Sequence, residues 1–127
     1  MSVIEEAIVS ILIAAATAAG SRIYPQLLPP EVTLPAIAYT RISTPRVRSL
    51  TGFSHLARPR FQLTAWANSK NAAKTLADEI FAVLDSYSGT VLGVIIQISF
   101  ADNELDTYEP TPEMYGVLTD YMIAHTE

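Results

Sequence analysis

The stretch RFQLTAWANSKNAAKTLADEIFAVLD, residues 60–85, contains two different hydrophobic periods in direct succession. In residues 60–67, Phe61, Leu63 and Ala65 fall on one face, which predicts a half-buried β-strand. Ser69 then stands at the N-cap position of a predicted helix, and Gly89 is expected to end that helix. The apolar residues that recur at helical spacing are Ala73, Leu76, Ala77, Ile80, Phe81 and Leu84.

The chain before residue 21 predicts another helix. Residues 7–19 (AIVSILIAAATAA) are apolar, Ser2 and Glu5 have capping-box spacing, and Gly20 supplies a stop. The run is shorter than the roughly 20 residues that span a bilayer, and Glu5 and Glu6 stand where a signal peptide needs positive charge. We therefore expect a core helix and no membrane contact.

Between the two helices, the pattern changes to that of strands and turns. A short strand is expected at residues 22–24, before a proline-rich connection. Residues 36–42 (AIAYTRI) are rich in β-branched and aromatic residues, so we expect them to pair with residues 60–67 in a hairpin. Residues 43–59 would then form the long loop of that hairpin.

Two further strands are predicted after the second helix. Residues 91–100 (VLGVIIQISF) are almost continuously apolar, as in a central strand, and residues 115–125 form the last strand after an acidic link at 101–114. The order α-β-β-β-α-β-β has no regular βαβ alternation. It predicts an α+β fold in one domain, residues 1–127, with a mainly antiparallel sheet. The helices are expected to pack on one face of that sheet through Ile8, Leu12, Ile80, Phe81 and Leu84.

The charged residues are strongly sorted along the chain. The formal net charge is −5, yet residues 32–77 hold seven lysines and arginines and no acid. Residues 78–127 hold ten acids and no lysine or arginine. Such sorting indicates either a polyanionic partner or a second copy of the same protein.

The sequence contains no pattern of residues typical of an enzyme. There is no cysteine, and His55 and His125 have no partner at metal-ligand spacing. Asp102, Glu104 and Asp106 alternate and would share a face in an extended segment, as ligands for a hard cation or, more commonly, as a solvated surface. No GxSxG, Walker A or HExxH pattern occurs. We expect no catalytic, cofactor-binding or metal-binding residues.

The arginine-rich segment 41–60 has three interpretations from its residues alone. Five arginines with Phe53 and His55 between them are typical of a small nucleic-acid-binding module, which contacts phosphates and stacks on bases. The acidic second half of the chain would repel phosphate, which favours a protein partner instead. A third interpretation is a loop that is charged only because it is exposed.

Three segments resemble a known family: LPAIAY at 34–39, the stretch 60–85, and DTYEPTPEMYGVLTDYMIAH at 106–125. They resemble the tail-completion or tail-terminator proteins of long-tailed phages and phage-like gene transfer agents. The resemblance implies an α+β structural protein without a cofactor, assembled in the host cytoplasm and located in the virion tail. It also implies a homo-hexameric ring that caps the tail tube, stops tube polymerisation and joins the tail to the head-side connector protein. Its partners would be other copies, the tail tube protein, that connector and the DNA passing through the ring.

A ring also accounts for the sorted charge. Each subunit of a cyclic ring presents one surface to the next subunit and a different surface to the previous one, so a positive patch can meet a negative one. The residues expected in this contact, on a neighbouring copy or a tube subunit, are Arg46, Arg48, Arg58 and Arg60 on the basic side and Asp102, Glu104, Asp106 and Glu109 on the acidic side.

Overall fold

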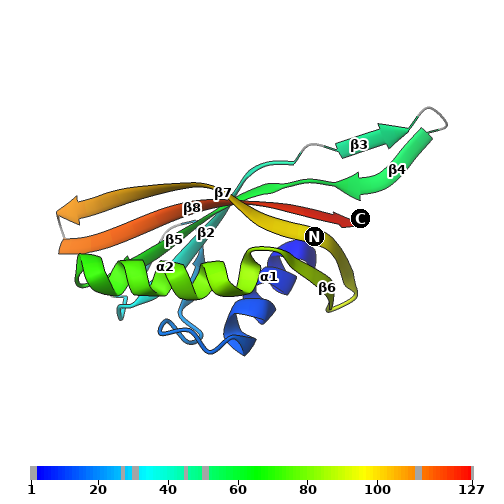
Figure 1. Ribbon diagram of the computed structural model, residues 1–127. Coiled ribbons are helices and arrows are strands. Elements are labelled where there is room, and N and C mark those ends of the chain that lie inside the picture. Colours follow the sequence, from blue (N-terminus) through cyan, green and yellow to red (C-terminus); the bar gives the residue numbers. More distant parts are fainter. Residues whose placement is uncertain are drawn as a thin grey trace.

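The computed structural model in Figure 1 describes residues 3–26, 28, 29, 32–44, 46–49, 52–110 and 113–126. For residues 3, 46–49 and 52–56 it describes the backbone alone. The predicted cap residue Ser2 therefore lies outside the described residues.

Two helices form as the apolar periodicity predicts, but both are shorter. Helix α1 (Val3–Ala14) ends before Gly20 because Ala16 takes a positive φ of 55°, which breaks the helical path. Helix α2 (Lys70–Leu84) begins at the predicted cap: the Ser69 hydroxyl accepts a hydrogen bond from the Ala72 amide at 3.2 Å. It ends at Leu84, so the prediction of an end at Gly89 was wrong.

The strands form one mainly antiparallel sheet, which confirms the α+β prediction. The strands are β1 (Ile23–Pro25), β2 (Ala36–Ser43), β3 (Arg46–Ser49), β4 (Gly52–Ala57), β5 (Arg60–Ala67), β6 (Tyr87–Val91), β7 (Val94–Pro110) and β8 (Glu113–Thr126). β2 and β5 pair in antiparallel register as expected, and β1 lies parallel to β2.

Strand β8 is the centre of the sheet. Along one side it pairs with β5 over residues 115–122, and with β4 at residues 125 and 126. Along its other side it pairs with β7 over nearly its whole length. Residues 96–99 lie between β6 and β8, as predicted for a central strand, whereas residues 91–93 form the end of β6 and the turn after it. Leu92 and Gly93 make a tight turn, both with positive φ, and the strand that follows is exposed at every second residue or so.

Two segments predicted as connections are strands. The connector 43–59 contains the hairpin β3–β4, which extends away from the body of the sheet (Figure 1). The acidic link 101–114 is also a strand, since β7 continues to Pro110 and pairs with β8 as far as Glu113. A strand can hold these acids because their side chains remain exposed while the backbone pairs with β8.

The hydrophobic core lies between the two helices and one face of the sheet (Figure 1). Phe61, Leu63 and Ala65 on β5 are buried, as predicted from their alternation. The predicted helix residues Ile8, Leu12, Ile80 and Leu84 are buried as well. Phe81 is 45% exposed, so its assignment to the core was wrong: one residue beyond Ile80, it lies at the edge of the apolar stripe. Within the described ranges, neither helix is long and apolar enough to cross a membrane.

Candidate functional site

The predicted basic residues lie on and beside the projecting hairpin. Arg46 and Arg48 are on β3, where the structure describes the backbone alone. Arg58 is exposed between β4 and β5, and Arg60 begins β5. The hairpin thus places two arginines beyond the body of the sheet and two where the chain returns to it.

The predicted acidic residues all lie on β7 and are exposed. Three of the four form ion pairs within the same chain. Arg60 pairs with Asp102, and with Asp120 of β8 at 3.6 Å between Nη1 and Oδ2. The other two pairs join α2 to β7: Lys74 Nζ lies 2.7 Å from Glu104 Oε2, and Lys70 Nζ lies 3.4 Å from Asp106 Oδ2.

Some of the predicted contact residues are paired within the subunit and others are not. The hydrogen bond to Glu104, with the charge attraction that accompanies it, raises the pKa of Lys74. Arg58 and Glu109, by contrast, form no ion pair with any side chain that the structure describes. The structure therefore brings Arg60 and Asp102 together within one subunit, and pairs the other acids with lysines that the sequence analysis did not consider.

The alternating acids do not gather into a metal site. Among the residues described, no group of three histidine or carboxylate side chains is placed to hold a metal ion. Asp102 turns toward Arg60 because a β-bulge interrupts the pairing between Ala101 and Asn103, whereas Glu104 and Asp106 face the lysines of α2. His125 is buried at the end of β8.

One face of β7 carries exposed apolar residues that the sequence analysis missed. Ile98, Phe100 and Leu105 are 46%, 40% and 56% exposed. They pair with Ala124, Met122 and Leu118 of β8, which alternate along that strand, so all three lie on the sheet face opposite the helices. The near-continuous apolar run 91–100 suggested burial on both faces, but both helices pack on the other face.

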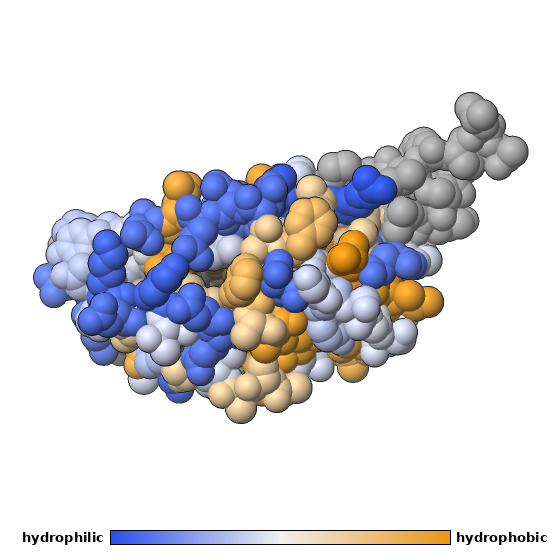
Figure 2. Space-filling model, viewed as in Figure 1, coloured by the Kyte–Doolittle hydropathy of each residue, from blue (hydrophilic) through white to orange (hydrophobic). Residues whose placement is uncertain are grey.

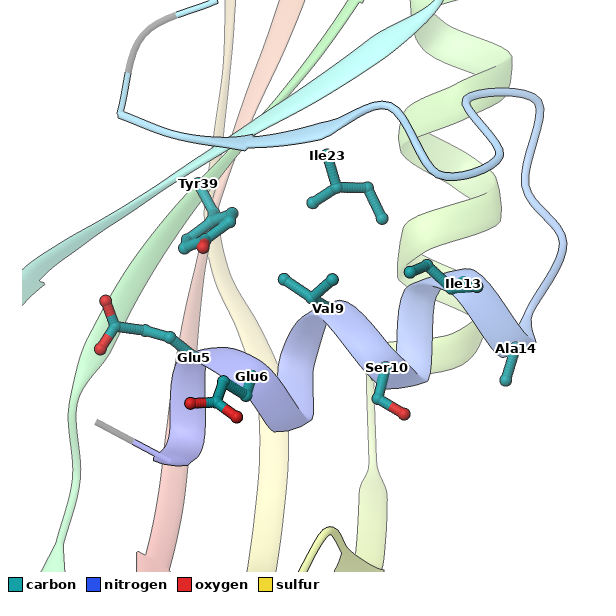
Figure 3. A pocket seen from close by; sticks show the side chains of 8 residues that line it. All are labelled: Glu5, Glu6, Val9, Ser10, Ile13, Ala14, Ile23 and Tyr39. Atoms are coloured by element: carbon teal, nitrogen blue, oxygen red, sulfur yellow. The ribbon is translucent and has the colours of Figure 1, made fainter. Parts of the chain in front are cut away.

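An open groove lies beside α1, where the helix faces the edge strand β1 and its neighbour β2 (Figure 3). Its volume is about 600 Å³. Val9 and Ile13 of α1, with Ile23 and the ring of Tyr39, give it an apolar lining, and the two carboxylates in the first turn of α1 lie at one end.

The two carboxylates of the groove differ in their surroundings. Glu5 Oε1 lies 3.2 Å from Arg41 Nη2, and burial together with the charge of Glu5 raises the pKa of Tyr39. Glu6 is exposed and forms no ion pair with a side chain in the described part of the chain.

On the face in Figure 2, hydrophilic residues gather over the half with α2 and the ends of β7 and β8, and apolar residues are more frequent toward α1.

Comparison with known proteins identifies the family. The model of the family described as tail completion protein gp17 matches residues 6–126. Among solved structures, the fold is similar to a chain of the "Virion of native gene transfer agent (GTA) particle". The TM-score is 0.80 at 13% identity, over 97% of this chain and 94% of that one. No curated protein matches significantly by sequence. Because the family model spans nearly the whole sequence, the chain belongs to the tail completion protein gp17 family and is a structural protein of the phage tail.

Proposed function

We propose that copies of this chain form a closed hexameric ring that caps the tail tube. In this role the ring stops polymerisation of the tube protein and presents a second surface to the connector on the head side. The observation that carries the proposal is the row of exposed apolar residues Ile98, Phe100 and Leu105 on the sheet face without helices. Exposed apolar residues grouped on one face are typical of a surface that is covered on assembly.

The sorted charge supports a ring in particular. A ring needs two different complementary surfaces on each subunit, and this chain carries a basic hairpin region and an acidic strand. The residues that we propose for contacts with neighbouring subunits or with the tube protein are Arg46, Arg48, Arg58, Arg60, Asp102, Glu104, Asp106 and Glu109.

The apolar surface is tested with a matched pair of variants. Leu105→Glu introduces a charge on the proposed interface, whereas Leu92→Glu introduces the same charge at the β6–β7 turn, where Leu92 is 61% exposed. Native mass spectrometry with and without tube protein should show rings for wild type and Leu92→Glu, and monomers for Leu105→Glu. Circular dichroism should show both variants folded. Rings of Leu105→Glu at the wild-type level would contradict this use of the sheet face.

Tail-length control is tested separately. Tube protein is polymerised in the presence of the purified chain, and tube lengths are measured by electron microscopy. We expect tubes to stop growing and to carry a ring at one end. Tubes that grow to the same length with and without the chain would refute the capping role, even if rings form.

The arginines are tested against the nucleic-acid alternative by reversing Arg46, Arg48, Arg58 and Arg60 to glutamate. If they contact protein, assembly is lost because like charges then face each other. If they contact DNA, the wild type binds duplex with an affinity that falls steeply with salt. Loss of DNA binding with assembly intact would favour the nucleic-acid role.

A further inference from the structure

We propose that the groove beside α1 receives the β3–β4 hairpin of a second copy of this chain. In this contact Arg46 and Arg48 of the hairpin meet the carboxylates of Glu5 and Glu6. The inference rests on the proposed ring and adds a second contact between its neighbouring subunits, beside that of the sheet face. Arg60, which follows the hairpin, remains paired with Asp102 of β7 in its own subunit.

The groove has the features of a docking site for an apolar and basic segment. Of its apolar lining residues, Ile13 is exposed and Val9 is half-buried, while Ile23 is buried. At one end, Arg41 neutralises part of the negative charge by pairing with Glu5. Glu6 has no such partner among the described side chains, so the groove keeps a net negative end.

The hairpin has the complementary composition. Residues 46–57 (RVRSLTGFSHLA) contain two arginines, no acid, and the apolar residues Val47, Leu50, Phe53 and Leu56. Among its described residues, the backbone is paired with the rest of the sheet at the base alone, where Leu56 and Ala57 pair with the end of β8. Strand β3 pairs with β4 and with no other strand in the described part of the chain. The hairpin therefore extends beyond its own subunit (Figure 1), as an arm that reaches a neighbour would.

The groove is a better receptor for these arginines than the acids of β7. Asp102, Glu104 and Asp106 already have a cationic partner in their own chain, which an incoming arginine would have to displace. At Glu6, an incoming arginine would have no cationic partner to displace among the described side chains. Because groove and hairpin are different parts of the subunit, each copy can give one and receive the other, which is the heterologous contact that a ring needs.

The charge contact is tested by a reversal and its rescue. We expect Glu6→Lys to raise the protein concentration at half assembly by about tenfold or more, since lysine then faces arginine. Adding Arg48→Glu in the same chain should restore assembly toward the wild-type level. Such a rescue would not be a local repair of α1, because residue 48 lies on the hairpin and residue 6 on the helix. Asp78→Lys, at an exposed position of α2, is the control and should assemble normally.

The position of the hairpin is tested by cross-linking, which the absence of cysteine makes simple. A chain with Ser10→Cys in the groove and Ser49→Cys on the hairpin is treated with a short bis-maleimide, with tube protein present. We expect a ladder of covalent oligomers up to the ring size. The pair Ser88→Cys and Ser49→Cys, with the first residue on β6 outside the groove, should give no ladder.

The outcomes separate this inference from the ring itself. A ladder together with rescue supports the hairpin–groove contact. Rings that form normally with Glu6→Lys, or that give no ladder from the Ser10 and Ser49 cysteines, overturn the contact and leave the ring standing. If the wild type forms no oligomer at all with tube protein present, both the ring and the contact are refuted.

Discussion

Replacing Leu84 with alanine tests the placement of α2 on the sheet. Leu84 is 1% exposed and belongs to the core, so the substitution removes three buried carbon atoms and leaves a cavity. At about 0.8 kcal/mol for each carbon, the lost transfer free energy is about 2.4 kcal/mol. A partly collapsed cavity brings the loss of unfolding free energy to about 3–5 kcal/mol.

The neighbouring Phe81 provides the matched control. It lies on the same helix, three residues away, and is 45% exposed. Phe81→Ala should lower the free energy of unfolding by no more than about 1.5 kcal/mol, because much of the ring is already in water and alanine is the better helix former. The two variants should therefore differ clearly, although phenylalanine is the larger residue.

The measurement is urea unfolding, followed by circular dichroism and by the fluorescence of Trp66, the single tryptophan. It is carried out at a concentration where the wild type is monomeric, since assembly would add to the apparent stability. For a chain of this size, a loss of 3 kcal/mol corresponds to a fall in Tm of roughly 9–15 °C. Equal losses in the two variants, or a larger loss for Phe81→Ala, would refute the orientation of α2.

Three further substitutions have expected outcomes. Ser69→Ala removes the cap that accepts the Ala72 amide and should lower the free energy of unfolding by about 1 kcal/mol in urea titrations, with Ser69→Asp close to wild type. Gly116→Ala places a Cβ 2.9 Å from the Trp66 ring, so calorimetry should show a loss of about 1–3 kcal/mol and the tryptophan emission should change. Burial raises the pKa of Tyr121 above its ordinary value of 10.0, so the folded state keeps a proton that the unfolded chain releases. Stability should therefore fall as the pH rises past 10, and Tyr121→Phe should reduce that fall.

For each of these substitutions, one result would contradict the physical explanation of its expected effect. Ser69→Asp as unstable as Ser69→Ala would show that the cap does not act through its oxygen. Unchanged emission and stability in Gly116→Ala would mean that Trp66 does not lie over that backbone. The alkaline dependence of Tyr121→Phe is compared with that of Tyr24→Phe, a control at a half-buried tyrosine of β1. Identical curves would remove Tyr121 as the cause.

The parts of the fold that were predictable from sequence are those with a local period. Phe61, Leu63 and Ala65 reveal a buried strand face because their alternation depends only on the geometry of an extended chain. Ser69 marks a helix start because its hydroxyl acts within one turn. Whether Phe81 is covered depends on what packs beside the helix, which its helical spacing does not reveal.

The second half of β7 could not be predicted as a strand from its own residues. Residues 102–106 are mostly polar and have no apolar alternation, so nothing local distinguishes them from a solvated link. They become a strand through pairing with β8, whose own pattern is clear. Long-range pairing of this kind overrides local preference.

In the candidate surfaces, too, local features were predictable from sequence and long-range contacts were not. Charge sorting along the sequence indicated an acidic and a basic region, but not that Lys70 and Lys74 of α2 would lie over the acids of β7. The groove combines residues of α1, β1 and β2, three segments separated in sequence. No sequence motif could have indicated it, because its side chains meet only after the sheet has formed.

The central position of β8 has a consequence for synthesis on the ribosome. Both of its long partners, β5 and β7, precede it in the chain, so they leave the ribosome before the strand that joins them. Until β8 emerges, each of them has an unpaired edge, and the apolar faces of the helices have no complete sheet to cover. The nascent chain must therefore remain unassembled until its last strand appears, and a pause just before β8 should increase aggregation and chaperone binding.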